Sequence, residues 1–170
     1  MVEPGDIILT SSNNIFVKAM KVLQSDPVNW GHALIVAEEG NAYSFSYSME
    51  YVNLDKYMKD EKRKKYIAFR YKHMTQDKLT FMLRAMEKLK GIEYGWGRLI
   101  LMLLDNIFGT RFFSKLSNNN RWQVCSSSVA WAYYVAFKMK FNGVDWRSVD
   151  PDDIEDHCRN SKDWVLITEV

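Results

Sequence analysis

A cysteine and a histidine lie in two apolar stretches of the sequence. Cys125 opens the run Val124-Cys-Ser-Ser-Ser-Val-Ala-Trp-Ala-Tyr-Tyr-Val-Ala-Phe137, and His32 lies far upstream in Trp30-Gly-His-Ala-Leu-Ile-Val36. A thiol at the start of a helix and an imidazole on a neighbouring strand are the minimum parts of a cysteine nucleophile, because both surroundings favour the thiolate. The backbone N–H groups of the same helix start could stabilise an oxyanion. The pair therefore indicates acyl-transfer chemistry.

Both residues also have an ordinary structural interpretation. A cysteine in an apolar helix is commonly a small buried hydrophobe, and a histidine on a strand is commonly a hydrogen-bonded structural residue. Cys158 follows His157 near a polar helix end and is interpreted as structural, and we assign no role to His73 or His157. The two cysteines lack the spacing of metal ligands, and a disulfide between them would require an oxidising compartment.

The sequence predicts that His32 lies on a strand and Cys125 on a helix. The strand covers Gly31 to Ala37 and turns through a hairpin into a second strand at Ala42 to Tyr47, while the helix covers Cys125 to Met139. Alternation along the first strand places His32, Leu34 and Val36 on one face. Further strands are predicted at Ile7–Thr10, Tyr66–Tyr71 and Trp164–Thr168, and further helices at Ile15–Leu23, Val52–Met58, Gln76–Lys90 and from about Pro151.

The composition is that of one globular domain. The chain has 170 residues, of which 47% are hydrophobic and 14% aromatic, which is enough to bury a core without disulfides. We expect a single domain over residues 1–170, with a partly helical insertion or flap at about 93–120. Its apolar stretch Leu99–Phe113 fits an ordinary buried helix. The alternative is an apolar flap over the cleft, which would allow peripheral contact with a membrane.

The charge and the N-terminal sequence bear on nucleic-acid binding, secretion and membrane insertion. Lys and Arg number 23 against 21 Asp and Glu, a net charge of +2 that does not indicate nucleic-acid binding. The basic run Lys59–Lys65 is interpreted as a solvated loop. The N-terminus has no pattern of a signal peptide, and the longest apolar stretch is far shorter than the roughly 20 residues that a membrane span needs. We therefore expect a cytoplasmic protein, with a phage- or virus-associated one as the alternative.

Four short motifs occur in the order in which they occur in a known superfamily. They are Pro4-Gly5-Asp6-Ile7-Ile8, Gly31-His32-Ala33-Leu34-Ile35-Val36, Lys90-Gly91-Ile92-Glu93-Tyr94-Gly95 and Val124-Cys125-Ser126-Ser127-Ser128-Val129. Together they span most of the chain and resemble the permuted branch of the NlpC/P60 papain-like superfamily. That branch contains the YiiX-like proteins and, more distantly, the lecithin:retinol acyltransferase-like enzymes. The resemblance implies an α+β fold in which a small antiparallel sheet packs on the helix that carries the nucleophile.

The resemblance also implies a set of site residues. Cys125 would be the nucleophile and His32 its general base and acid. The family often places a Glu on the strand after the hairpin to orient the imidazole, but this chain has Ser44 as the preferred occupant and Ser46 as the second choice. A serine hydroxyl can orient the ring but cannot stabilise an imidazolium as a carboxylate does. Glu38 and Glu50 are interpreted as turn residues that fit this position less well.

The sequence departs from the family pattern a second time, just after the candidate nucleophile Cys125. The family often has an acidic residue two positions after the cysteine, where this chain has Ser127, and we expect the change to affect packing or a local cap.

Three functional interpretations follow. The first is a cysteine hydrolase or acyltransferase that acts on an amide or ester of a peptide, a cell-wall peptide or a lipid, with no metal or organic cofactor. The second is a papain-like binding or host-interaction module with little turnover, which the missing carboxylate near Ser44 favours. The third treats Cys125 and His32 as core residues of an unrelated α+β domain.

Overall fold

The frame of the protein is an antiparallel sheet with the strand order β4-β3-β2-β1-β5-β6. The computed structural model describes residues 1–11, 29–38, 40–45, 48–59, 65–90, 101, 104–105, 108–110, 112–113 and 124–170. The strands are β1 (Ile7–Thr10), β2 (His32–Val36), β3 (Asn41–Phe45), β4 (Met49–Asn53), β5 (Tyr66–Tyr71) and β6 (Trp164–Glu169). The first strand, β1, therefore lies between β2, which carries the candidate histidine, and β5, which pairs with the C-terminal strand β6.

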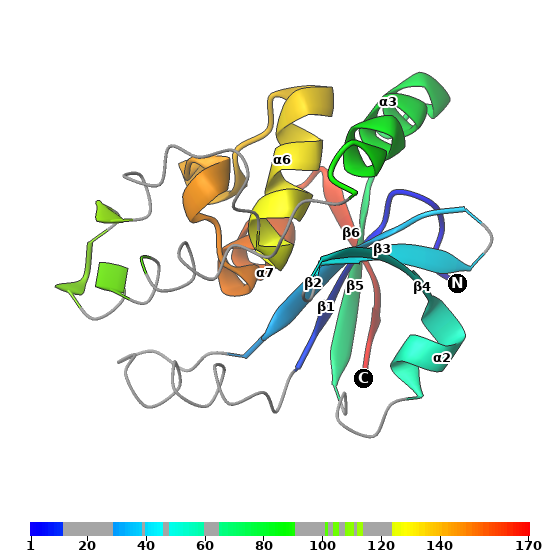
Figure 1. Cartoon of the computed structure of the whole chain (residues 1–170), viewed down its shortest axis with the longest axis horizontal. Helices are drawn as coiled ribbons and strands as arrows, with labels where there is room; N and C mark the ends of the chain where they lie inside the picture. The colour runs from blue at the N-terminus through cyan, green and yellow to red at the C-terminus, as the bar shows by residue number, and fades with distance from the viewer. Residues whose placement is uncertain are drawn as a thin grey trace.

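Helices cover both faces of this sheet unequally. One face carries α3 (Gln76–Glu87), α6 (Cys125–Phe137) and α7 (Pro151–Asn160), whereas the short α2 (Leu54–Met58) lies on the other face (Figure 1). Two short 3-10 turns, Phe141–Gly143 and Trp146–Ser148, connect α6 to α7. We call the two sides the α6 face and the α2 face. The architecture is α+β, with a small antiparallel sheet packed on helices, as the sequence predicted.

Side-chain alternation divides the core between the two faces. Ala33 and Ile35 of β2 pack in the large cluster under α3, α6 and α7, together with Cys125. Leu34 and Val36 pack in a smaller cluster with Leu54 and Tyr57 of α2. Because neighbouring residues of a strand point to opposite faces, His32 belongs to the α2 face, as the alternation predicted.

Local capping explains where most of the helices begin. The Thr75 hydroxyl accepts from the backbone N–H of Lys78, and the Asp150 carboxylate accepts from that of Asp153. Pro151 occupies the first turn of α7, as predicted. The Asn53 side chain accepts from Lys56 N, so α2 begins at Leu54 and not at the predicted Val52.

The region before α2 differs from the sequence prediction. β4 is an edge strand that the sequence did not predict, because most of its residues are exposed and it lacks an apolar alternation. Of the other predicted segments, the helix at Ile15–Leu23 lies outside the described residues, as does most of the insertion at 93–120. In the described part of the chain, every helix is too short or too polar to cross a membrane.

Candidate functional site

Cys125 is the first residue of α6. Its helix start is held by two serines: Ser127 Oγ accepts from Val124 N at 3.0 Å and donates to Val124 O at 3.1 Å, and Ser126 Oγ donates to Val149 O at 2.7 Å. Ser127 therefore acts as a local cap, one of the two effects that the sequence predicted for this position. These three hydrogen bonds fix the turn that presents the thiol.

The Cys125 sulfur is buried against β2. The residue is 7% exposed, and its sulfur interacts with the backbone N–H groups of Ala33, Ser126 and Cys125 itself. Burial raises the pKa of the thiol above its ordinary value, and these backbone groups oppose the shift without cancelling it. The thiol is therefore protonated at neutral pH in this conformation.

His32 is the first residue of β2 and contacts the predicted third member of the site. Its Nε2 lies 3.0 Å from the Oγ of Ser44, which is 1% exposed, and its ring lies 6.2 Å from that of Tyr57, centroid to centroid. The structure thus brings His32 and Ser44 together on the α2 face. A hydroxyl at this distance fixes the orientation of the imidazole.

The thiol and the imidazole approach β2 from opposite faces. Cys125 belongs to the α6-face cluster and touches the backbone of Ala33, whereas the ring of the preceding residue, His32, lies toward α2. The structure therefore places the sulfur beside the backbone that carries the imidazole.

Acidic residues of α7 hold the segment that leads into His32. Asp152 Oδ1 accepts from Trp30 N at 3.2 Å, and the Trp30 indole donates to Glu155 Oε2 at 2.5 Å. Burial, reinforced by the nearby charge of Asp150, raises the pKa of Asp152 to about 7. The sequence did not single out these residues, because acidic residues that follow Pro151 signal only a helix start.

The carboxylate nearest to Ser44 in the sheet is Glu50. The two residues are direct cross-strand partners in the β3–β4 pair, and their side chains share the α2 face. Glu50 thus lies on β4 and not in a turn, which corrects the sequence interpretation. Glu38 does follow the end of β2, in the hairpin, and Ser46 lies outside the described residues.

Thr10 adds a polar group that the sequence did not single out. It is the cross-strand partner of His32 in the β1–β2 pair and is completely buried. Its hydroxyl has no hydrogen-bond partner within the described part of the chain. Buried hydroxyls normally bind a protein group or a water molecule, and Thr10 adds a polar group to the α2 face beside His32.

The remaining cysteine and histidines lie away from this arrangement. Cys158 is a free, buried thiol of α7, and Cys125 is also free, so the two do not form a disulfide. His157 Nδ1 accepts from Asn142 N, and His73 pairs with Asp163 at the surface. Among the described residues, no group of three or more His, Cys, Asp or Glu is placed to hold a metal ion.

Comparison with known proteins supports the fold and leaves the activity open. No family model matches the chain, and no curated protein sequence matches it. Among solved structures, the chain is similar to that of the metalloprotein yiiX from Escherichia coli O157:H7, which carries the family label DUF1105. The TM-score is 0.68 at 13% sequence identity, over 99% of this chain and 97% of that one. The protein therefore has a YiiX-like α+β fold.

Proposed function

We propose that the protein is a permuted NlpC/P60-type papain-like cysteine hydrolase or acyltransferase that acts on an amide or an ester. One observation carries this proposal: the Cys125 sulfur, at the start of α6, contacts the backbone N–H of Ala33. Ala33 directly follows His32, whose imidazole is held by Ser44. A thiol at a helix start and an oriented imidazole on the adjoining strand are the parts that nucleophilic catalysis requires, and in this structure they lie on opposite faces of β2.

The reaction would proceed in two steps. The Cys125 sulfur attacks the carbonyl carbon and its proton passes to His32, which then donates it to the departing amine or alcohol. The resulting thioester is cleaved by water in a hydrolase, or by an acceptor hydroxyl or amine in an acyltransferase. Backbone N–H groups at the start of α6 would stabilise the oxyanion.

The burial of the thiol sets a condition on this mechanism. Because desolvation raises the pKa of Cys125, a standing thiolate is disfavoured and the proton must leave as the sulfur attacks. The imidazole must therefore approach the sulfur when substrate binds. Substrates that fit the proposal are a peptide, a cell-wall peptide amide, and a lipid ester or amide.

Labelling with an iodoacetamide probe tests the proposal. The folded protein should be alkylated at Cys125 at neutral pH, and His32→Ala should lower the labelling rate roughly a hundredfold, since a positioned base contributes at least that much. His73→Ala removes an exposed histidine with its own acidic partner and is the matched control. Cys158→Ser should leave the labelling unchanged. Labelling of Cys158 alone, or an unchanged rate in His32→Ala, would contradict the proposal.

A second candidate function is a papain-like binding or host-interaction module with little turnover. The observation that favours it is the neutral Ser44 in contact with His32, together with a thiol that burial keeps protonated. A panel of peptide amides, peptidoglycan fragments and lipid esters separates the two functions. Turnover that disappears in Cys125→Ser supports the enzyme, whereas labelling of Cys125 without turnover of any substrate supports the binding module.

A further inference from the structure

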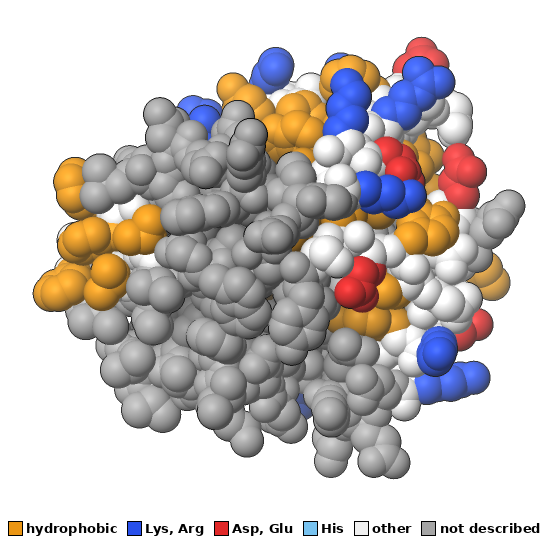
Figure 2. All heavy atoms as spheres, viewed as in Figure 1, with side chains coloured by type: hydrophobic (Ala, Val, Ile, Leu, Met, Phe, Trp, Pro, Cys, Tyr) orange, Lys and Arg blue, Asp and Glu red, His pale blue; other side chains and the backbone are white. Residues whose placement is uncertain are grey.

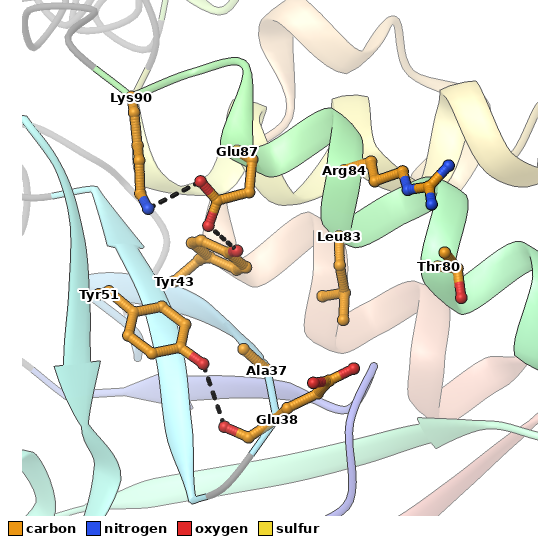
Figure 3. Close-up of a pocket in the computed structure, with 9 residues that line it drawn as sticks. All are labelled: Ala37, Glu38, Tyr43, Tyr51, Thr80, Leu83, Arg84, Glu87 and Lys90. Atoms are coloured by element: carbon orange, nitrogen blue, oxygen red, sulfur yellow. Dashed lines mark hydrogen bonds and ion pairs between the residues drawn. The ribbon is translucent and has the colours of Figure 1, made fainter.

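A cavity of about 380 Å³ lies between α3 and the β2–β3 hairpin. Helix α3 and the turn after it contribute one wall, and the hairpin with β4 contributes the other, as Figure 3 shows. The lining residues are Ala37, Glu38, Tyr43, Tyr51, Thr80, Leu83, Arg84, Glu87 and Lys90. This volume lies within the range of small-molecule sites, about 300–1,000 Å³.

Three of the lining side chains, Tyr43, Glu87 and Lys90, bond to one another. Glu87 accepts a hydrogen bond from the Tyr43 hydroxyl and pairs with Lys90 Nζ at 2.7 Å. The bonds from Lys90 and Tyr43 lower the pKa of the Glu87 carboxyl below its ordinary value, so Glu87 is ionised and satisfied. This group is neutral overall and forms one end of the cavity.

The two other lining charges are opposite in sign and unpaired. Among the described residues, neither the Arg84 guanidinium nor the Glu38 carboxylate forms an ion pair or hydrogen bond. In Figure 3 both side chains extend away from the Glu87 group, with Leu83 between them. On this side of the molecule basic and acidic side chains lie interspersed with apolar ones (Figure 2).

The wall between these charges is apolar and held in place. Tyr51 packs edge-on against Tyr43, with ring centroids 5.2 Å apart, and its hydroxyl donates to the backbone O of Glu38 at 3.1 Å. That bond ties the backbone of Glu38 to β4. The cavity thus presents a cation and an anion around the apolar surface of Leu83.

The cavity is separate from the Cys125 site. It adjoins Ala37, just past the end of β2, whereas the sulfur contacts Ala33 near the start of the strand. Four residues of extended chain span roughly 13 Å. Occupation of this cavity therefore does not require any chemistry at Cys125.

We propose that this cavity binds a short peptide with free termini, a zwitterion whose ammonium and carboxylate groups are separated by an apolar segment. The guanidinium of Arg84 matches a carboxylate, because its planar N–H groups can bind both oxygens. The carboxylate of Glu38 binds the ammonium group, and an aliphatic side chain of the ligand packs on Leu83 and Tyr51. A single anion or a single cation would leave one of the two charges unpaired.

Three matched peptides test the proposal by NMR titration of the full chain at low salt. Gly-Leu has both termini, N-acetyl-Gly-Leu lacks the ammonium group and Gly-Leu amide lacks the carboxylate. Gly-Leu should bind with a millimolar Kd, and each blocked peptide should bind about tenfold more weakly, the loss expected for one charge-assisted hydrogen bond. Cys125→Ser should bind Gly-Leu as the wild type does.

Variants assign each terminus to its partner. Arg84→Gln should bind Gly-Leu and its amide equally, and Glu38→Gln should bind Gly-Leu and its acetylated form equally. Lys88→Gln, from the end of α3, and Glu50→Gln, from exposed β4, remove charges outside the cavity and should leave all three affinities unchanged. Absence of Gly-Leu binding at 20 mM, equal binding of the three peptides by the wild type, or equal losses in the control variants would overturn the proposal.

Discussion

The Nε2 of His32 lies 3.0 Å from the Oγ of Ser44, and both residues lie on the α2 face of the sheet. A hydroxyl group, and not a carboxylate, therefore contacts the imidazole. It can hold the imidazole in one orientation, but it adds little to the stability of the charged imidazolium. Ser44 therefore supplies orientation to the imidazole and little stabilisation of its charge.

Ser44→Ala should slow alkylation of Cys125 about fivefold. The substitution removes one neutral hydrogen bond, which contributes about 1 kcal/mol, and leaves the imidazole free to rotate. Ser44→Thr keeps the hydroxyl and should restore most of the rate, provided that thermal unfolding shows the added methyl is accommodated. An equal loss of rate in both variants would indicate a packing effect and contradict the orienting role.

The pH profile of alkylation separates two ways of activating the thiol. Because burial raises the pKa of Cys125, ionisation of the thiol alone would make the rate climb beyond pH 9. If His32 removes the proton, the rate should instead level off above the range in which imidazoles titrate, about pH 6 to 7. The measurement is the alkylation rate constant from pH 5.5 to 9.5 for the wild type and His32→Ala.

Asp152 should make the protein more stable in weak acid than at pH 8. Its pKa in the folded state is about 7, above the value of about 3.9 in an unfolded chain. The folded state therefore binds more protons between these values, and the free energy of unfolding falls as the pH rises through them. The full contribution is present below about pH 4 and is lost above about pH 7.

Asp152→Asn keeps a side-chain oxygen that can accept from Trp30 N and removes the titration. Its unfolding free energy should be less dependent on pH and should exceed that of the wild type at pH 8 by about 1 kcal/mol, after allowance for partial exposure. Urea unfolding between pH 4.5 and 8 measures this difference. Asp156→Asn, an exposed change in the same helix, should follow the wild type.

Tyr133→Phe should destabilise the fold. The Tyr133 side chain is fully buried in α6, and its hydroxyl donates to the backbone O of Gly5 at 2.6 Å. Removal leaves that carbonyl without this donor, at a cost of about 1–3 kcal/mol. Tyr134→Phe, on a half-buried neighbour, should change the unfolding free energy by less than about 0.5 kcal/mol. Similar effects of the two variants in urea unfolding would contradict this reasoning.

Much of the framework follows from local sequence patterns. The β5 strand at Tyr66–Tyr71 has the predicted bounds, and α6 begins at the predicted Cys125 because the extended Val124 and the serine-rich turn that follows favour a helix start there. α6 ends at Phe137, two residues early, where Lys138 adopts a left-handed conformation with φ 57°. β4 was missed, because an exposed edge strand needs no apolar pattern and is formed by pairing with β3.

The sequence by itself determined the α+β class, the helix start at Cys125 and the face of β2 on which His32 lies, since each depends on residues near one another in the chain. Only the tertiary structure decided which face α6 covers, the approach of the Cys125 sulfur to Ala33 and the support of Trp30 by Asp152. Those contacts join residues about 90 to 120 positions apart. Packing of the whole core fixes them, and no local pattern encodes them.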